Sequence, residues 1–346
     1  MLKKYSLIAA LMIVLAVVLA ACGDNKEDKS GDTSKPATET STAAGDTSQS
    51  QTETSGGEGA TADASASTKV IKYLDQEYTV PAKTDRIVVT GALEAMEDSI
   101  LMDIHPVGAI SVRGKFPSLF SSIVDKAESV GEKTEPNFEK ILQLKPDVIL
   151  ASTKFDPAVV EQLSKIAPTI PYSHVSANWS SNLELLGELS GKQDKAAELI
   201  AQYNSDLESV KSGIVSKLAD KKVALVRIRQ GAIQLYASQV YFNPMLYEEL
   251  GLKMPAEVQA AKAQDMISLE QLAAMNPDVL MIQFSEDENA DKPKALEELQ
   301  NSPIFQSINA AKNNQVLVNI VDPLAQGGTA YSKIQFLQAF QSKLGQ

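Results

Sequence analysis

The sequence predicts an α/β protein with two Rossmann-like lobes, one long rigid helix that joins them, and a ligand cleft between them. The first observation is a stretch of sixteen residues that occurs twice, as NFEKILQLKPDVILAS at residues 137–152 and as SLEQLAAMNPDVLMIQ at residues 268–283. The second is the alternation of strand and helix patterns, and the third is a long helix pattern between the two copies. The copies lie 131 positions apart. A solenoid repeat is far shorter, so we interpret the copies as one fold unit used in two lobes.

Each copy carries local signals for a short helix, a turn and a buried strand. Asn137 and Ser268 are residue types that cap a helix N-terminus, and Ser268 with Gln271 has the spacing of a capping box. Pro146 and Pro277 end the helices, and the short apolar runs after them indicate buried strands.

Composition limits the classes of function. The chain has 346 residues, 44% of them hydrophobic, and a formal net charge of −12. This is long enough for two domains, and the acidic balance argues against nucleic-acid binding. Cys22 is the only cysteine and there are two histidines, so neither an intrachain disulfide nor a multi-cysteine metal site is expected.

The first residues predict export. Lys3 and Lys4 precede an apolar run over residues 7–21, which has the length of a signal peptide rather than of a membrane span. The run ends Leu-Ala-Ala-Cys-Gly, which resembles the lipobox of bacterial lipoproteins. We therefore expect a signal peptide at 1–21 and lipidation at Cys22, with acyl chains that hold the protein on the membrane. The alternative is an ordinary export signal with an incidental cysteine.

A low-complexity segment follows. Residues 24–68 contain no aromatic residue and no Ile, Leu or Val, so they cannot bury enough apolar surface to fold. Together with Cys22, we expect a disordered Ser/Thr-rich tether over 22–68, with a reach of roughly 40 Å. Such a tether favours a Gram-positive cell surface, facing outside, over a periplasm.

The first lobe is expected at 69–190. Its strands alternate with helices, which predicts a parallel sheet. The expected elements are a hairpin at 70–80, strands at 86–91, 107–111 and 169–173, and helices at 92–103 and 157–166, in addition to the first copy of the repeated unit.

An inter-lobe helix is expected within 191–221. Residues 192–212 lack Gly and Pro, and their apolar positions recur every three or four residues. At ~1.5 Å per residue the helix spans ~30 Å, which is about the width of a domain. We expect it to act as a stiff connection; the alternative is that it belongs wholly to one lobe.

The second lobe is expected at 222–346. It should open with a strand at 222–229 and a hairpin at 230–236. The remaining expected elements are helices at 245–250, 269–275 and 330–344, an acidic surface loop at 285–293, and a strand at 316–321.

Taken together, the lipobox, the tether, the two lobes, the long helix and the two Glu…Pro-Asp-Val units resemble a class III solute-binding protein of an ABC importer. The resemblance covers residue 70 to the C-terminus. The segments most similar to iron-siderophore members are 110–120, 137–150 and 326–334. The resemblance implies a monomer that is not an enzyme, needs no cofactor, captures a ferric siderophore and delivers it to a permease dimer with associated ATPases.

The resemblance also implies a role for two glutamates. In such proteins one glutamate on each lobe docks into an arginine pocket of a permease subunit, and Glu139 and Glu270 match these positions. Both are expected in the first turn of a helix, where an anion is favoured. The alternative is that they only complement the helix dipole.

The cleft is expected to be basic. Arg113, Lys115, Arg227 and Arg229 follow or end predicted strands, and open α/β sheets bind ligands at the carboxyl ends of their strands. A siderophore already fills the coordination positions of iron, so the protein needs cations and donors rather than metal ligands. Arginine suits this because it is always charged and binds oxygens with a fork of donors. The alternative for each is a surface ion pair.

Other side chains are also candidates for ligand contact. Each has an alternative role in packing or local hydrogen bonding. They are Phe116, Trp179, Tyr236, Tyr241 and Phe242 as an apolar wall, with Gln326, Tyr331 and His174 as polar contacts.

Two kinds of alternative remain, a different ligand and a different class of protein. Haem or vitamin B12 is the other ligand class, since His174 and the tyrosines are possible haem ligands. A direct zinc or manganese binder would need more histidines. A surface enzyme lacks a G-x-S-x-G elbow or a phosphate-binding glycine loop, and an adhesin would not need the repeated glutamates. The sequence leaves open whether the siderophore is a hydroxamate, a citrate-hydroxamate or a catecholate.

Overall fold

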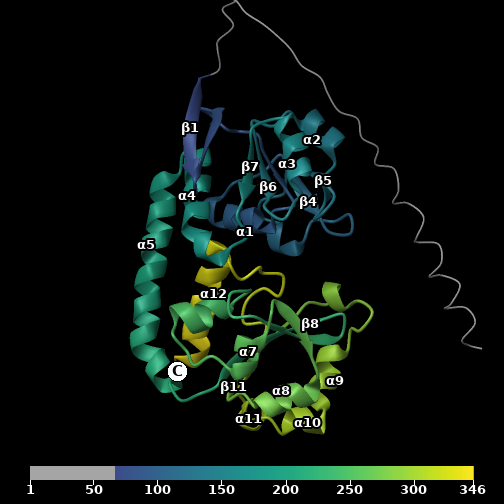
Figure 1. Ribbon diagram of the computed structural model, residues 1–346, viewed down its shortest axis with the longest axis vertical. Helices are drawn as coiled ribbons and strands as arrows, with labels where there is room; N and C mark the ends of the chain where they lie inside the picture. Colours follow the sequence, from purple (N-terminus) through teal and green to yellow (C-terminus); the bar gives the residue numbers. More distant parts are fainter. Residues whose placement is uncertain (1–66, 346) are drawn as a thin grey trace, which may run out of the picture. The chain divides into compact units, whose positions relative to one another are not determined.

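The computed structural model describes residues 67–345 (Figure 1). The expected signal peptide, Cys22 and almost all of the expected tether lie outside the described residues. The first strand begins at Thr68, which we had placed in the tether. Among the described helices, none is long and apolar enough to cross a membrane.

The first lobe contains a parallel sheet in the order β5-β4-β3-β6-β7, as the alternation predicts. Figure 1 shows the helices of this lobe packed around the sheet. Its strands are β3 (Ile87–Thr90), β4 (Gly108–Ser111), β5 (Glu128–Glu132), β6 (Val148–Ser152) and β7 (Thr169–Tyr172). Its helices are α1 (Leu93–Met102), α2 (Phe138–Leu144), α3 (Pro157–Ser164) and α4 (Trp179–Ser190), with short turns η1 (Ser118–Phe120) and η2 (Ser176–Asn178). The predicted hairpin is β1 (Thr68–Tyr73) with β2 (Gln76–Pro81).

Strand periodicity divides the core of this lobe into two faces. Val88 and Ile149 pack with α2 and α3 on one face, whereas Val89 and Leu150 pack with α1 and α4 on the other. Successive side chains of a strand point to opposite faces, so these buried strands are apolar on both sides.

The second lobe has a mixed sheet in the order β10-β9-β8-β11-β12. The strands β8, β11 and β12 are parallel, whereas β9 and β10 are antiparallel to their neighbours. The predicted hairpin after the first strand accounts for this reversal. The strands are β8 (Val223–Arg229), β9 (Ala232–Tyr236), β10 (Gln264–Ile267), β11 (Val279–Phe284) and β12 (Val316–Val318).

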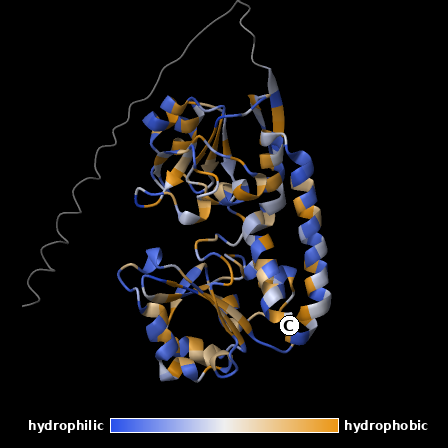
Figure 2. Cartoon of the chain, turned by 180° about the vertical axis from the view of Figure 1, so that it is seen from behind, coloured by the Kyte–Doolittle hydropathy of each residue, from blue (hydrophilic) through white to orange (hydrophobic). Residues whose placement is uncertain are grey.

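Most expected helices of the second lobe are present, with two differences. The expected helix at 245–250 is a π-helix, and the expected acidic surface loop contains a 3-10 turn. The helices and turns are η4 (Pro244–Glu249), α7 (Ala256–Ala260), α8 (Leu269–Met275), η5 (Asp287–Asn289), α9 (Ala295–Asn301), α10 (Pro303–Gln306), α11 (Asn309–Lys312) and α12 (Ala330–Leu344). Figure 2 shows hydrophobic residues concentrated in the strands of both sheets.

The long helix is α5 (Gln193–Val210), and it continues through a π-turn η3 (Lys211–Val215) into α6 (Ser216–Leu218). This helical segment lies within the expected range of 191–221 and extends beyond residue 212, where the run without Gly and Pro ends. Ala196 packs in the core of the first lobe, whereas Leu207 and Val210 pack in the core of the second. The alternative, that the helix belongs wholly to one lobe, is wrong.

The repeated unit forms the same local structure twice. The Asn137 side chain accepts a hydrogen bond from the third residue of α2, and Ser268 and Gln271 form a complete capping box on α8. Lys145 and Asn276 end the two helices with left-handed φ values of 46° and 48°. The predicted caps are confirmed.

The aspartate of each Pro-Asp-Val turn joins the unit to the neighbouring strand. The Asp147 carboxylate accepts hydrogen bonds from the backbone N–H groups of Asp85 and Arg86, each at 2.8 Å. The Asp278 carboxylate accepts one from the N–H group of Lys222 at 2.9 Å. The recurring aspartate therefore fixes the start of β3 in one lobe and of β8 in the other.

We expect Asp147→Ala to lower the free energy of unfolding by about 1–3 kcal/mol, because two backbone donors lose a charged acceptor. Denaturant unfolding followed by circular dichroism measures the change. The control is Asp85→Ala, which removes only an exposed ion pair with Lys83 and should cost less than about 1 kcal/mol. Equal losses in the two variants would contradict the assigned role.

Candidate ligand-binding cleft

The last residues of β8 carry two arginines that share one carboxylate. Arg227 Nε lies 2.8 Å from Glu288 Oε2, and Arg229 Nε lies 3.3 Å from Glu288 Oε1. Arg227 is buried, Arg229 is exposed and Glu288 is half-buried. Our description of 285–293 as a surface loop therefore needs correction, because Glu288 turns inward and orients both guanidinium groups.

Aromatic side chains back the buried arginine. The guanidinium carbon of Arg227 lies 5.3 Å from the centre of the Tyr241 ring, which in turn packs against Tyr236 at 4.8 Å. Burial raises the pKa of the Tyr236 hydroxyl, although the charge of Arg227 opposes this. Phe242 is fully buried and stacks on Phe336, so we correct its role from cleft wall to core.

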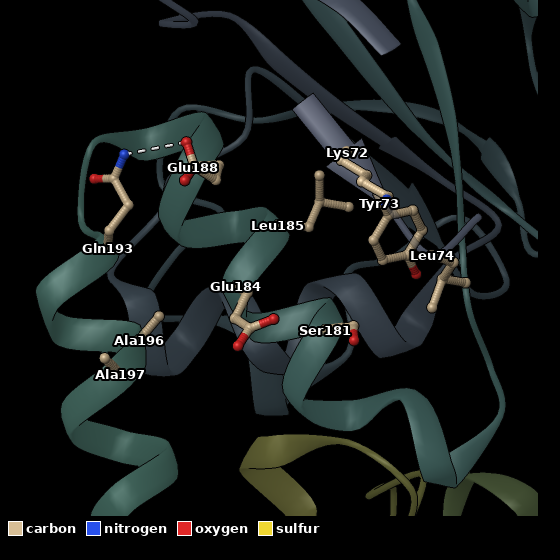
Figure 3. Close-up of a pocket in the computed structure, with 10 residues that line it drawn as sticks. All are labelled: Lys72, Tyr73, Leu74, Ser181, Glu184, Leu185, Glu188, Gln193, Ala196 and Ala197. Carbon is tan, nitrogen blue, oxygen red and sulfur yellow. Dashed lines mark hydrogen bonds between the residues drawn. The ribbon is translucent and has the colours of Figure 1, made fainter. Parts of the chain in front are cut away.

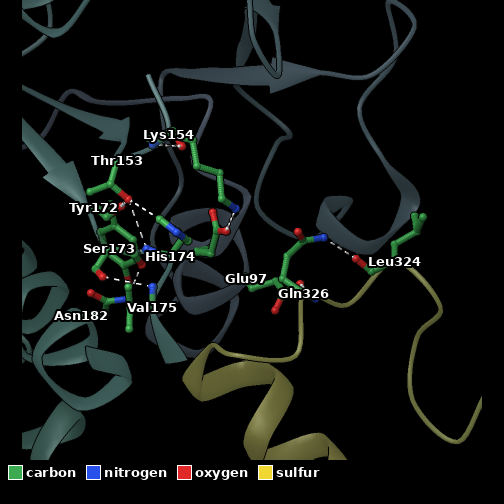
Figure 4. A network of polar contacts seen from close by, with 12 residues as sticks. Glu97, Thr153, Lys154, Tyr172, Ser173, His174, Val175, Asn182, Leu324 and Gln326 are labelled. Carbon is green, nitrogen blue, oxygen red and sulfur yellow. Dashed lines mark hydrogen bonds and ion pairs between the residues drawn. The ribbon is translucent and has the colours of Figure 1, made fainter. Parts of the chain in front are cut away.

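The first lobe contributes two lysines that sequence reasoning missed. Lys154, which Figure 4 labels, follows β6. It forms an ion pair with Glu94 at 2.8 Å. Lys133 follows β5 and is exposed. Its pKa is nevertheless lowered, chiefly by surrounding protein and by the charge of Lys154, and further by Arg229 and Arg227.

The charges of Lys154, Arg229 and Arg227 thus reach Lys133 from both lobes, and Glu94 and Glu288 form ion pairs with Lys154 and with the two arginines. Lys133 and Lys154 follow the carboxyl ends of parallel strands, where open α/β sheets bind ligands. The same rule led us to Arg227 and Arg229; no strand was expected before Lys133, and the expected strand before Lys154 was not followed to its end.

Arg113 lies in a turn after β4 and reaches the second lobe. The N–H groups of Arg113 and Gly114 both donate to the Glu132 carboxylate at 2.9 Å, which holds the turn. The Arg113 guanidinium donates to the backbone oxygen of Asp287 at 3.3 Å, next to Glu288. Lys115 is exposed in the same turn and makes no side-chain hydrogen bond within residues 67–345.

His174 lies near Lys154 in the first lobe. Its Nδ1 atom is 2.7 Å from Thr153 Oγ1 (Figure 4). Burial lowers the pKa of His174, and the charge of Lys154 lowers it further. A neutral imidazole is therefore expected at neutral pH, which can donate or accept a hydrogen bond at the edge of the cleft.

Gln326 and Tyr331 are half-buried near the start of α12. The Gln326 N–H group donates to Glu97 at 2.7 Å, and its side-chain amide donates to the backbone oxygen of Leu324 at 2.9 Å. The Tyr331 N–H group donates to Asp98 at 3.1 Å. Their backbones are thus fixed by the first lobe.

Two predicted aromatic contacts have packing roles. The Trp179 ring meets the Tyr203 ring edge-on at 4.9 Å, and Lys333 Nζ lies 5.9 Å from each ring centre. This places Trp179 in the packing among α4, α5 and α12 rather than among the arginines. Phe116 packs against the core of the first lobe.

The two repeated glutamates are exposed. Glu139 lies in the first turn of α2 and Glu270 in the first turn of α8, and Figure 1 shows these helices on different lobes. The pKa of Glu270 is lowered by its own backbone N–H group and by the Ser268 hydroxyl. Neither glutamate forms an ion pair within the described residues, so both carboxylates are available to a partner.

A separate hollow of about 490 Å³ lies between the β1–β2 hairpin and the helices α4 and α5 (Figure 3). Its lining includes Lys72, Leu74, Glu184 and Glu188 and none of the cleft cations. It is therefore distinct from the basic cleft. In the described part of the chain, no three His, Cys, Asp or Glu side chains are grouped as a metal site.

Known proteins resemble this chain in sequence and in fold. A family model described as periplasmic binding protein matches residues 111–319. The chain is 50% identical over 344 residues to the iron-uptake system-binding protein of Bacillus subtilis (strain 168), which covers 99% of each chain. The solved structure of the triscatecholate siderophore binding protein FeuA from Bacillus subtilis, complexed with ferri-bacillibactin, is 56% identical with a TM-score of 0.74, covering 80% of this chain and 98% of that chain. Staphylococcus aureus SirA complexed with staphyloferrin B is 26% identical with a TM-score of 0.66, covering 80% and 98%.

Proposed function

Since the chain belongs to the periplasmic binding protein family, we propose that it captures a ferric siderophore outside the cytoplasmic membrane and delivers it to an ABC importer for iron uptake. It is a substrate-binding protein rather than an enzyme, and the siderophore complex is its ligand rather than a cofactor. The observation that carries the proposal is that Arg113, after a strand of the first lobe, reaches Asp287 of the second, next to the Glu288 carboxylate that holds Arg227 and Arg229. The lowering of the Lys133 pKa by the charges of Lys154, Arg229 and Arg227 supports it.

The charge of the cleft favours a strongly anionic ligand. A ferric catecholate complex presents negatively charged oxygens around an iron whose coordination is complete, so cations and hydrogen-bond donors are what it requires of a protein. Arginine forks and lysine ammonium groups supply both. Among the siderophore classes we therefore propose a tris-catecholate, and the FeuA structure with ferri-bacillibactin supports this choice.

Glu94 and Glu288 have a role before the ligand binds. Each holds a cation in place through an ion pair at 2.8 Å, which limits repulsion among the four cations before the ligand arrives. Glu288 also fixes the direction of the Arg227 fork. The cations are thus oriented in advance, which reduces the ordering cost of binding.

A titration panel tests the ligand class. Isothermal calorimetry with a ferric tris-catecholate, a ferric hydroxamate, ferric citrate, haem and cobalamin should give submicromolar affinity for the tris-catecholate alone. Calorimetry is preferable to Trp179 fluorescence, because Trp179 is packed among helices. Binding of haem or cobalamin with no response to any siderophore would replace the proposal by the haem or vitamin B12 alternative.

We propose that Cys22 is lipidated and that the segment 22–68 tethers the protein to the outer side of the membrane, on a Gram-positive surface. The lipobox resemblance supports this. We further propose lobes at 69–190 and 222–346 joined by a helical segment at 191–221, and a monomer that works with a permease dimer and its ATPases.

Docking to the permease is assigned to Glu139 and Glu270. Support comes from their exposure, from their equivalent places in the two copies of the repeated unit, and from the absence of ion-pair partners for either within residues 67–345. A pair of anions at matching positions of two lobes suits a partner made of two similar subunits with cationic pockets.

A further inference from the structure

Helix α1 carries three carboxylates within little more than one turn, all in buried positions. Glu94 is directed to the cleft, where it pairs with Lys154. Glu97 and Asp98 have no part in the cleft chemistry and are both fully buried. Apart from Tyr172, their hydrogen-bond partners lie at or just before the start of α12, more than two hundred residues further along the chain.

Glu97 receives three hydrogen bonds from this segment. Its Oε1 atom accepts from the Gln326 N–H group at 2.7 Å, and its Oε2 atom accepts from the hydroxyls of Thr329 at 2.5 Å and Ser332 at 2.6 Å. The Thr329 hydroxyl itself accepts from the Ser332 N–H group, and the Ser332 hydroxyl accepts from the Gly327 N–H group. Both hydroxyl protons are therefore left for Glu97.

Asp98 completes the arrangement. It accepts from the Tyr331 N–H group at 3.1 Å and from the Tyr172 hydroxyl at 2.8 Å. Burial raises the pKa of Glu97 to about 8 and of Asp98 to about 7, and these donors oppose that rise. A buried carboxylate is tolerated when its oxygens are fully hydrogen-bonded, and first-turn N–H groups of a helix need acceptors.

Helix α12 belongs to the cores of both lobes. Ala330 in its first turn packs in the core of the first lobe, whereas Phe336 and Phe340 pack in the core of the second. Lys333, between them, forms a buried ion pair with Glu249 of the second lobe. The helix is thus a second connection between the lobes beside α5.

We propose that Glu97 and Asp98 form an inter-lobe clamp, defined as these two carboxylates with Gln326, Thr329, Tyr331 and Ser332, which fixes the width of the cleft. They are positioning residues: they touch no ligand, and they hold the start of α12 against α1. Because Glu94 and Glu97 lie one turn apart on α1, the clamp also fixes the cleft carboxylate relative to the second lobe. A change in lobe angle would require its hydrogen bonds to break.

Distances between spin labels on the two lobes test the clamp. The full-length chain with Cys22→Ser has no cysteine, so Gln162→Cys on α3 and Glu297→Cys on α9, both exposed, accept the labels alone. With the clamp intact, double electron–electron resonance should give one narrow distance distribution. Glu97→Gln should widen it about twofold, since a hinge rotation is freed. Ser332→Ala is a milder variant that should widen it in the same sense.

The matched control is Tyr172→Phe, which removes a buried hydrogen bond to Asp98 from within the first lobe. It should lower the melting temperature, as the clamp variants do, and leave the distance distribution as in the parent. If Glu97→Gln fails to fold, the distance distribution of Ser332→Ala tests the clamp instead. A parental distribution in the folded clamp variants, or equal widening in Tyr172→Phe, would overturn the clamp. The measurement uses no ligand, so it is independent of the proposed siderophore.

Discussion

Replacing both Arg227 and Arg229 by glutamine should weaken binding of a ferric tris-catecholate by about a thousandfold. Each arginine is expected to make charged hydrogen bonds to the complex, worth about 1.5–3 kcal/mol, and every ~1.4 kcal/mol is tenfold in affinity. Arg227 is buried against Tyr241 and held by Glu288, so a flexible lysine elsewhere cannot replace its fork. Calorimetric titration of parent and variant measures the loss.

The control for that variant changes the net charge equally at a distance from the cleft. Lys126→Gln with Lys312→Gln removes two exposed cations and should change the affinity less than about threefold, because exposed charges beyond a Debye length are screened. A comparable loss in this control would show that net charge, and not the four-cation cleft, governs affinity. Retained affinity in the arginine variant would reject the proposed binding site.

The fold was predictable because its signals are local and occur twice. Asn137 and Ser268 marked helix starts, Pro146 and Pro277 marked helix ends, and the apolar runs after them marked buried strands; the structure confirms each of these elements. The π-helical turn at residues 244–249 and the antiparallel strand β10 were not predicted. They depend on tertiary packing rather than on periodicity.

Arg227 and Arg229 were predicted from the sequence as cleft cations, whereas Lys133 and Lys154 were not. Arg227 and Arg229 share a strand, so the period of two places them together. Lys133 and Lys154 lie on separate loops, and only the sheet order β5-β4-β3-β6 brings their strand ends to one edge. The role of Glu288 could not be predicted for another reason. A run of acidic residues has the sequence pattern of a solvated loop, and only the structure shows that one member turns inward.

The inter-lobe clamp could not be predicted from the sequence, for a third reason. Glu97 and Asp98 occupy a helix pattern in which carboxylates ordinarily mark the solvent face. Their partners are backbone N–H groups and hydroxyls near the far end of the chain, and these residue types carry no signal of pairing. A buried carboxylate is recognisable only once its donors are located.

The second large effect concerns delivery of the siderophore to the permease rather than binding of the siderophore. A chain with both Glu139→Arg and Glu270→Arg should abolish siderophore-dependent iron uptake, because two cationic pockets of a permease would meet like charges, and such juxtapositions cost several kcal/mol. Both residues are exposed, and neither forms an ion pair with a cleft cation within residues 67–345, so ligand affinity by calorimetry should stay within about twofold of the parent. Uptake of radiolabelled ferric siderophore is measured in cells whose own copy of the protein has been deleted.

The matched control reverses two other exposed glutamates, one on each lobe. Glu161→Arg on α3 with Glu297→Arg on α9 produces the same change in net charge and should leave most of the uptake intact. The single variants Glu139→Arg and Glu270→Arg should each retain part of the uptake, since one lobe still docks. Normal uptake by the Glu139 and Glu270 double variant would exclude docking through the repeated unit. The two glutamates would then only complement the dipoles of α2 and α8, and the repetition would reflect the fold alone.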